Sequence, residues 1–331
     1  MDSLLHSLPR RALLAGVSAF AASAALAPFT AHAKAPASLA RAPAFYRFKV
    51  GDITAISVSD GPLALGDPTQ VISGPKEDIN ALLTESFLPT GVWSIDQNAV
   101  VLITGGSVVL FDTGMGTSKI FGDTAGRLIA NLQAAGIAAG DVDHVIISHA
   151  HPDHCWGLMA NEGAGPPNFP NAQIHISQAD FDFWTDEAKA SINDMMKTII
   201  GGTRPQLLPN RARMRFFKDG QEIVPGVQAM ATPGHTVGHT SFMIASGGQT
   251  LCLIADIAHH YVLSLARPRF AFGFDTDPQQ GIATRVRLFD TLAVNRTQLL
   301  GYHFPWPGIG HVAKVGDAYH FIATPMDLAG G

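Results

Sequence analysis

Apolar and polar positions alternate with two different periods along the chain, and each period predicts one kind of element. Alternation at every second residue is typical of strands, whereas apolar residues three and four apart are typical of helices. Gly, Pro and Asn punctuate the chain between these runs. The pattern predicts strands at 44–60, 142–148, 172–177, 222–231 and 241–254, and helices at 121–135, ending near Gly136, and at 179–200.

Two further segments have their own patterns. Between residues 98 and 112, two β-rich runs flank Thr104-Gly105-Gly106-Ser107, which predicts a hairpin that ends in Asp112-Thr113-Gly114. Residues 62–89 are punctuated by Pro and Gly around a short helical patch, and we expect this segment to arch over the functional site.

The order of these elements predicts the fold class. No repeat of 20 to 50 residues is present. Strands that lie in hairpins and are mixed with helices favour an α/β sandwich with two mixed β-sheets inside and helices outside, rather than a wholly parallel sheet. The 331 residues, 47% of them hydrophobic and 15% charged, are enough for one large or two modest domains and exclude a disordered chain.

The first 33 residues differ from the rest. Arg10-Arg11 precedes an Ala-rich stretch at 12–27, and Ala31-His32-Ala33 is a small-x-small cleavage site. A membrane anchor is the alternative, but the stretch is shorter than the roughly 20 residues that span a bilayer. We therefore predict a twin-arginine signal at 1–33, a linker at 34–43, a domain at 44–325 and a tail at 326–331, with the mature protein periplasmic or secreted and without a membrane anchor.

The charge balance of the mature chain limits the classes of partner that it can bind. Without Arg10, Arg11 and Asp2, the mature chain carries 20 basic and 26 acidic residues, a formal charge of −6. This balance does not favour a nucleic-acid partner.

Cys155 and Cys252 are the two cysteines, and their surroundings predict separate buried thiols rather than a disulfide.

One motif has the residue types of a metal site. His149-Ala150-His151-Pro152-Asp153-His154 follows the apolar run at 145–147 after the single residue Ser148. A strand end followed by a Pro-containing loop lets His149 and His151 face one side while Asp153 and His154 face another, which suits two adjacent metal ions. The motif predicts a dinuclear hydrolase; a solvated histidine tract that only scavenges metal is the alternative.

Three more ligand candidates follow in the second half of the chain. His235 lies in the glycine-lined segment Thr232-Pro233-Gly234-His235, which lets the backbone fold tightly around an ion. Asp256 comes directly after four apolar residues, where a buried carboxylate is costly unless it bridges cations or caps a helix; we favour the bridge. His303 has rigid, aromatic neighbours that suit a fixed ligand.

Together these motifs resemble the metallo-β-lactamase superfamily: an Asp-Thr-Gly strand end, H-x-H-x-D-H, a later Gly-His, an Asp and a final His, over residues 44–325. Phe-Pro-Asn-Ala at Phe169 and Phe-Pro-x-Pro-Gly-Ile-Gly-His ending at His311 are similar to the exported methyl parathion hydrolase group, and quorum-quenching lactonases share the metal site. The resemblance implies an αβ/βα sandwich and a metal-dependent hydrolase. It leaves the oligomeric state open, although relatives are often homodimers.

The resemblance also implies residue roles. His149, His151 and His235 would bind one metal, Asp153, His154 and His303 the other, and Asp256 both. Asp112 would orient a ligand imidazole from outside the ligand set. We expect two Zn²⁺ ions, although imidazole and carboxylate ligands also admit manganese, cobalt or iron.

The metal pair suggests a mechanism. A water bridging the ions would ionise near neutral pH and attack a carbonyl carbon or phosphorus, while Asp153 orients it and relays its proton and Asp256 holds both ions. The resemblance places Phe121 and Trp184 near the entrance of an apolar pocket for aromatic groups; core packing is the alternative for both. An apolar or aromatic small molecule is therefore the expected partner.

Several reactions fit this site. We expect hydrolysis of aryl esters, lactones and organophosphate triesters such as methyl parathion. Hydrolytic dehalogenation of an activated aromatic ring and a mononuclear-iron sulfur dioxygenase are the alternatives, and a non-catalytic metal-binding protein is a third.

The remaining unusual residues receive simpler interpretations. His239 is expected to brace the His235 loop, His259 and His260 to line the cleft or face solvent, and His144 and His175 to be ordinary strand or surface residues. Cys155 and Trp156 replace small residues of the family pattern and are expected to crowd the back of the site.

Overall fold

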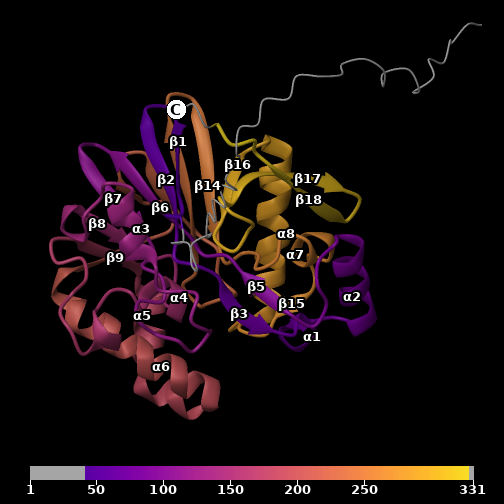
Figure 1. The fold of residues 1–331 in the computed structure, drawn as a ribbon, viewed down its shortest axis with the longest axis horizontal. Helices are drawn as coiled ribbons and strands as arrows, with labels where there is room; N and C mark the ends of the chain where they lie inside the picture. The colour runs from indigo at the N-terminus through magenta and orange to yellow at the C-terminus, as the bar shows by residue number, and fades with distance from the viewer. Residues whose placement is uncertain (1–41, 328–331) are drawn as a thin grey trace, which may run out of the picture. The chain divides into compact units, whose positions relative to one another are not determined.

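Two seven-stranded mixed sheets form the centre of the protein in the computed structural model, which describes residues 42–327. The signal and linker predictions, apart from residues 42 and 43, lie outside the described residues. The first sheet has the order β1-β2-β6-β7-β8-β9-β10 and the second β11-β12-β13-β14-β16-β17-β18. Figure 1 shows the sheets at the centre, with α3 and α5 on the side of the first and α8 on the side of the second.

The strands of the first sheet are β1 (Phe45–Val50), β2 (Ile53–Ser59), β6 (Asn98–Thr104), β7 (Ser107–Phe111), β8 (His144–Ile146), β9 (Gln173–Ser177) and β10 (Met214–Phe217). Those of the second are β11 (Glu222–Val224), β12 (Val227–Ala231), β13 (Thr240–Ser246), β14 (Gln249–Ala255), β16 (Gln298–Gly301), β17 (Ile309–Val315) and β18 (Ala318–Ala323). Two small sheets pair β3 (Leu63–Gly66) with β5 (Trp93–Ile95) and β4 (Ile72–Ser73) with β15 (Ala271–Phe272).

The helices lie between these strands. They are α1 (Pro68–Val71), α2 (Lys76–Glu85), α3 (Leu128–Ala134), α4 (Pro152–Cys155), α5 (Gln178–Thr185), α6 (Asp194–Leu207), α7 (Leu263–Ala266) and α8 (Pro278–Asn295). Short 3₁₀ turns lie at Ala139–Asp141, Asn161–Gly163, Glu187–Ser191 and Leu208–Arg213. In the described part of the chain, none of the helices combines the length and apolar character needed to cross a membrane.

Alternating side chains on the strands produce the layers. In β14, Leu251 and Leu253 pack into the core between the sheets, whereas Cys252 and Ile254 belong to a core that includes Leu288 of α8. Because successive side chains of a strand point to opposite faces, each sheet contributes to a central and an outer core. This arrangement confirms the predicted α/β sandwich.

Several predicted elements are subdivided in the structure. The predicted strand at 44–60 is the hairpin β1–β2, and those at 222–231 and 241–254 are the hairpins β11–β12 and β13–β14. The predicted hairpin at 98–112 is confirmed by β6 and β7. Turn glycines explain the breaks: Gly51 and Gly247 both have positive φ.

The helix predictions had the wrong boundaries. The helix expected at 121–135 begins only at Leu128, because Asp60 accepts hydrogen bonds from the main-chain N–H groups of Gly126 and Leu128 and holds the preceding residues in a loop. The helix expected at 179–200 divides into α5, a 3₁₀ turn and α6, since Asp186 and Asn193 each cap a new start. The prediction also lacked α8, although Asp277-Pro278 is a typical helix start.

Candidate metal centre

The histidine-rich motif lies in the loop after β8 and in the single turn of α4. His151 is the N-cap residue of α4 and Pro152 its first residue, so Asp153 and His154 follow on a helical turn. The main-chain N–H of Thr113 donates to the carbonyl of His154 at 2.7 Å and ties this turn to the end of β7. The backbone of the motif is therefore held at both ends, by β8 before it and by the hydrogen bond from Thr113 after it.

The His235 segment is held equally tightly. Gly234 has a φ of +132°, and a Cβ there would lie 2.2 Å from the main-chain nitrogen of Gly281. Only glycine fits this contact between the His235 loop and α8. His239 braces the centre as expected, because its Nδ1 lies 3.0 Å from the carbonyl oxygen of Thr232 and its Nε2 accepts the N–H of Asp256 at 3.0 Å.

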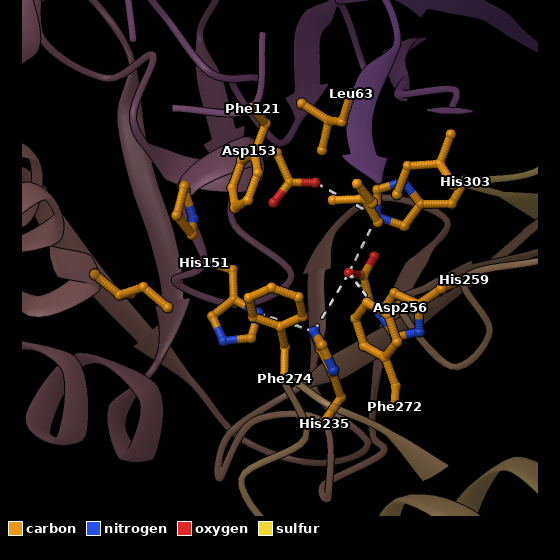
Figure 2. A pocket seen from close by; sticks show the side chains of 14 residues that line it. Leu63, Phe121, His151, Asp153, His235, Asp256, His259, Phe272, Phe274 and His303 are labelled. Carbon is orange, nitrogen blue, oxygen red and sulfur yellow. Dashed lines mark hydrogen bonds and ion pairs between the residues drawn. The ribbon is translucent and has the colours of Figure 1, made fainter. Parts of the chain in front are cut away.

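All seven predicted ligands lie together, around Asp256. Its Oδ2 lies 3.3 Å from His235 Nε2 and 3.6 Å from His149 Nε2, and its Oδ1 lies 3.2 Å from His154 Nε2. Figure 2 shows Asp256 between His235 and His303. The donor atoms form two groups, in each of which all lie within 4.8 Å of one another: His149, His151 and His235; and Asp153, His154, Asp256 and His303.

Buried atoms without partners show that these residues fit a metal. His149 Nε2, His154 Nε2 and Asp256 Oδ1 are buried and make no hydrogen bond; the last two lie 3.2 Å apart in a geometry that forms none. Each such atom costs about 1–3 kcal/mol when no partner compensates it. Divalent cations between these atoms would compensate all three.

The electrostatics of the cluster also fit cations. Burial, followed by the neighbouring imidazoles, lowers the pKa of His149 and His151 well below the usual value, so both rings are neutral and offer a lone pair. Burial alone would raise the pKa of Asp256, but the surrounding imidazoles outweigh it and hold that pKa well below its usual value. Around Asp256 the effect of burial is outweighed by the carboxylates, which raise the pKa of His154 well above its usual value and that of His235 to about 9, so these two rings would release a proton when a divalent cation binds.

His259 also belongs to the cluster, which the sequence analysis did not predict. Its Nε2 lies 3.2 Å from Asp256 Oδ2, and its donor atoms form a third group with His235 and Asp256. The side chain lines the pocket and is 2% exposed, so the first of the two predicted positions, lining the cleft, is confirmed and the solvent-facing one is excluded. Its position three residues after Asp256 was the available signal, because a turn can bring such a pair together.

Carboxylates outside the ligand set hold the imidazoles. Asp112 lies where it was predicted: its Oδ2 is 2.9 Å from His154 Nδ1. Asp275 makes the equivalent contact with His235 Nδ1 at 2.8 Å. Asp180 accepts the N–H groups of Ala150 and Gly238, both at 2.7 Å. Neither Asp275 nor Asp180 was predicted, because nothing in their local sequence marks them.

A small apolar pocket of about 40 Å³ opens onto the cluster. Phe121 lines it, as the resemblance implied, together with Leu63 and Leu65 of the segment expected to arch over the site. The remaining apolar side chains of its wall are Ile95, Pro152, Ile199, Phe272 and Phe274.

Trp184 is not among the residues that line the pocket, so core packing, the alternative given for it, describes its position. It is 1% exposed and packs edge-on against the ring of His151, with centroids 4.9 Å apart. The indole of α5 therefore packs in the core against the ring of a ligand candidate and does not line the pocket. Trp156 is also buried, and its Nε1 donates to Thr203 at 2.9 Å.

Both cysteines are free and buried, as predicted. Burial raises the pKa of the Cys155 thiol, which keeps it protonated. It belongs to none of the donor groups found in the described part of the chain.

Comparisons with known proteins agree with this geometry. A model of the metallo-beta-lactamase superfamily matches residues 94–294. The chain is 28% identical over 197 residues to an N-acyl homoserine lactonase of Bacillus cereus, covering 54% of this chain and 68% of that protein. It is 30% identical over 184 residues to an N-acyl homoserine lactonase of a Bacillus species, covering 50% and 63%.

Two solved structures are similar over most of the chain. AidC, a dizinc quorum-quenching lactonase in complex with a product, N-hexanoyl-L-homoserine, has a TM-score of 0.80 and 27% identity, over 86% of this chain and 98% of that one. The hydrolase AbOPH of the beta-lactamase superfamily also has a TM-score of 0.80 and 27% identity, over 87% and 100%.

Proposed function

We propose that this chain cleaves lactones and related esters with two zinc ions. The chain belongs to the metallo-beta-lactamase superfamily and is a metal-dependent hydrolase. The two groups of donor atoms with Asp256 between them carry this proposal. The similarity to N-acyl homoserine lactonases and to a dizinc lactonase supports it. Aryl esters and organophosphate triesters such as methyl parathion also present an electrophilic centre to an attacking water, a carbonyl carbon or a phosphorus, and are included.

Each donor group would hold one ion. His149, His151 and His235 would bind the first, Asp153, His154 and His303 the second, with Asp256 shared between them. When bound, such a pair lowers the pKa of water from 15.7 to about 7 and polarises a carbonyl or phosphoryl oxygen.

Asp153 is the side chain best placed to move a proton. It lines the pocket, and its Oδ2 lies 3.4 Å from His303 Nε2. Its backbone is held because Tyr302 donates its hydroxyl to the Asp153 carbonyl at 2.7 Å. The carboxylate would orient an attacking water, accept its proton and return that proton to the departing oxygen.

The apolar wall determines which substrates approach. Phe121, Phe272 and Phe274 line the pocket beside the ligand candidates (Figure 2) and would exclude water from the reacting group. An aromatic or aliphatic substituent would pack against them, whereas a charged one would lose its hydration without a partner.

The two alternative reactions make different demands on the same metal centre. Dehalogenation would need a halogenated ring stacked against these phenylalanines, and its product would include halide. A mononuclear-iron dioxygenase needs one donor group, and the second group argues for hydrolysis.

The experiment is metal analysis of the purified mature protein joined to four assays: an aryl ester, a lactone, an organophosphate triester and a halogenated aromatic nitrile. Two zinc ions per chain and ester or lactone turnover would support the proposal. One iron with oxygen consumption, or halide release without ester cleavage, would overturn it. His303→Ala should abolish turnover, whereas His320→Ala, on the exposed face of β18, is the matched control.

We also propose export by the twin-arginine route, which rests on Arg10, Arg11 and the Ala-rich stretch after them. Fractionation of the Arg10→Lys/Arg11→Lys variant tests it. The variant should remain in the cytoplasm while the unchanged chain reaches the periplasm or medium; equal distribution of the two would contradict export by this route.

A further inference from the structure

One buried carboxylate outside the metal centre holds both ends of a loop that forms part of the pocket wall. The loop, residues 114–127, lies between β7 and α3, and none of its residues belongs to a helix or strand. It contains Phe121 and is called the Phe121 loop here. Asp60, which directly follows β2, is fully buried, and its carboxylate accepts main-chain N–H groups from the beginning and from the end of this loop.

The contacts of Asp60 are made by both of its carboxylate oxygens. Oδ2 accepts the N–H of Met115 at 2.9 Å and that of Gly126 at 3.1 Å. Oδ1 accepts the N–H of Leu128, the first residue of α3, at 2.8 Å. The main-chain carbonyl oxygen of Asp60 accepts the N–H of Arg127 at 3.0 Å. One residue therefore bonds to the beginning of the loop, to its end and to the helix that follows.

The loop ends pack closely on this carboxylate and on each other. A Cβ at Gly114 would lie 2.4 Å from Asp60 Cγ, and a Cβ at Gly126 would lie 2.2 Å from the main-chain oxygen of Gly116. Both glycines also have positive φ, +68° and +81°, a conformation that other residues rarely adopt. The approach of the two ends is thus built into the sequence of the loop.

Asp60 is ionised under the conditions of an esterase assay. Burial raises its pKa to about 6, and the N–H groups of Met115, Leu128 and Gly126 oppose part of that rise. At a pH of about 8 the group is therefore a carboxylate, and both oxygens act only as acceptors. Hydrogen bonds to an ionised acceptor are roughly twice as strong as neutral ones, which suits an anchor for a loop without regular structure.

The middle of the loop is bound to the segment that follows Asp60 in the chain. The main-chain oxygen of Phe121 accepts the N–H of Ala64 at 2.9 Å. Thr124 Oγ1 donates to the main-chain oxygen of Pro62 at 2.6 Å. Asp60 therefore fixes the ends of the loop and also begins the segment to which its middle is bound.

Phe121 connects the loop to the pocket. Its side chain lines the pocket together with Leu63 and the ligand candidate Asp153 (Figure 2). Its ring also packs edge-on against Phe274, with centroids 6.3 Å apart. The pocket has a volume of only about 40 Å³, so a small displacement of this ring changes what the pocket can hold.

We propose that Asp60 is a positioning residue that determines substrate selectivity: through the Phe121 loop it sets where the Phe121 ring lies against an aromatic group of the substrate. Asp60 does not itself line the pocket. This inference rests on the proposed ester-cleaving function. Weaker anchoring of the loop should impair the binding of aromatic substrates more than that of small ones, because only an aromatic group packs on the ring.

The kinetic test compares phenyl acetate with methyl acetate at pH 8. Asp60→Asn keeps the shape of the side chain and one acceptor oxygen, but its NH₂ group faces an N–H. The ratio of the KM for phenyl acetate to the KM for methyl acetate should rise about fivefold, as expected for one lost hydrogen bond, whereas kcat for the two esters should change in the same proportion. The matched control is Asp143→Asn, since Asp143 accepts the N–H of Val108 at 2.8 Å and does not line the pocket; it should leave the KM ratio unchanged.

A double variant shows whether the effect passes through the Phe121 ring. Phe121→Ala alone should raise the same KM ratio. Asp60→Asn added to Phe121→Ala should raise it no further, because the ring that Asp60 positions is then absent. An equal rise from Asp60→Asn in both backgrounds would overturn the proposal.

A structural readout does not depend on turnover. Hydrogen exchange, followed by mass spectrometry, should be at least about tenfold faster in Asp60→Asn for peptides that cover residues 114–128, and unchanged for peptides of β14. Exchange that is equally faster in both regions would show a general loss of stability and overturn the local role. Thr124→Val loosens the same loop without changing Asp60 and should raise the KM ratio in the same direction, so the proposal stays testable if Asp60→Asn does not fold.

The kinetic and exchange experiments separate the two proposals. Faster exchange confined to the Phe121 loop, without hydrolysis of any ester, would overturn the proposed function and keep Asp60 as the anchor of the loop. Ester hydrolysis with the same KM ratio in Asp60→Asn as in the unchanged protein would overturn the selectivity role and keep the proposed function.

Discussion

His235 Nδ1 lies 2.8 Å from Asp275 Oδ1, and their side chains are only 4% and 1% exposed. Oδ2 of the same carboxylate accepts the main-chain N–H of Phe272 at 3.1 Å and lies 4.0 Å from Arg285 Nη2. Phe272 lines the pocket. One carboxylate thus sets both the orientation of a predicted ligand and the position of a pocket wall.

Asp275→Asn should weaken metal binding by about 10- to 100-fold, because the amide keeps the shape of the side chain and loses the charge that makes the His235 imidazole a strong ligand. Competition with a chelating dye measures the affinity of each ion. Asp317→Asn, in the exposed turn after β17, is the control. An unchanged affinity for both ions would remove Asp275 from the support of the centre.

Asp112→Asn should act in the same way through His154, by about 10- to 100-fold. Folding should change less than metal binding, because asparagine adopts the positive φ of 61° at this position more readily than most residues. Metal affinity and the unfolding midpoint are measured on the same samples. A large loss of stability with intact metal affinity would contradict the assigned role.

Metal removal should destabilise the fold. At an ion concentration of 1,000 times Kd, binding stabilises the native state by about 4 kcal/mol, which corresponds to a Tm decrease of roughly 10 °C on chelation. Differential scanning calorimetry before chelation, after it, and after zinc is restored measures the effect. The variant His154→Ala should respond less; equal Tm values with and without chelator in the unchanged protein would refute the expectation.

His175 should make the protein less stable in mild acid. Burial, followed by the neighbouring charges of His144 and Arg215, lowers its pKa to about 4, whereas the unfolded chain keeps the usual 6.5. The unfolded state therefore binds the proton first as the pH falls, so this contribution is complete above pH 6.5 and is lost towards pH 4.

The measurement is denaturant unfolding between pH 7 and pH 4. His175→Gln keeps an amide near the position of the Nε2 that pairs with His144 at 3.1 Å, without the titrating group. Its stability should fall less over this interval than that of the unchanged protein. Parallel curves for the two proteins would show that His175 does not contribute.

Phe121 and Trp184 should differ in what their loss affects. Phe121→Ala removes part of the pocket wall and should raise the KM for aryl esters several-fold, with a small effect on stability. Trp184→Ala leaves a hole in the core beside His151 and should cost about 3–5 kcal/mol of unfolding free energy. Steady-state kinetics and denaturant unfolding of both variants provide the comparison, and the opposite pattern would reject it.

Local pattern was sufficient for much of the fold. The alternating residues of β6 and β7 and the turn at Gly105-Gly106 follow one another directly in the chain, so the hairpin could be predicted from the sequence. The start of α3 could not be predicted in this way, because it depends on a distant partner. Asp60 is more than 60 residues from the start of α3, and its hydrogen bonds decide where that helix begins.

The sequence by itself determined the seven metal-ligand candidates, because their residue types, order and glycine-lined settings are local and match a known family. Only the tertiary structure decided how they are supported. Asp275 comes 40 residues after His235, Asp180 joins two separate loops, His259 turns into the cluster, and Trp184 turns away from the pocket. The physical reason is that hydrogen bonding and burial depend on which segments meet in space, and a local pattern does not contain that information.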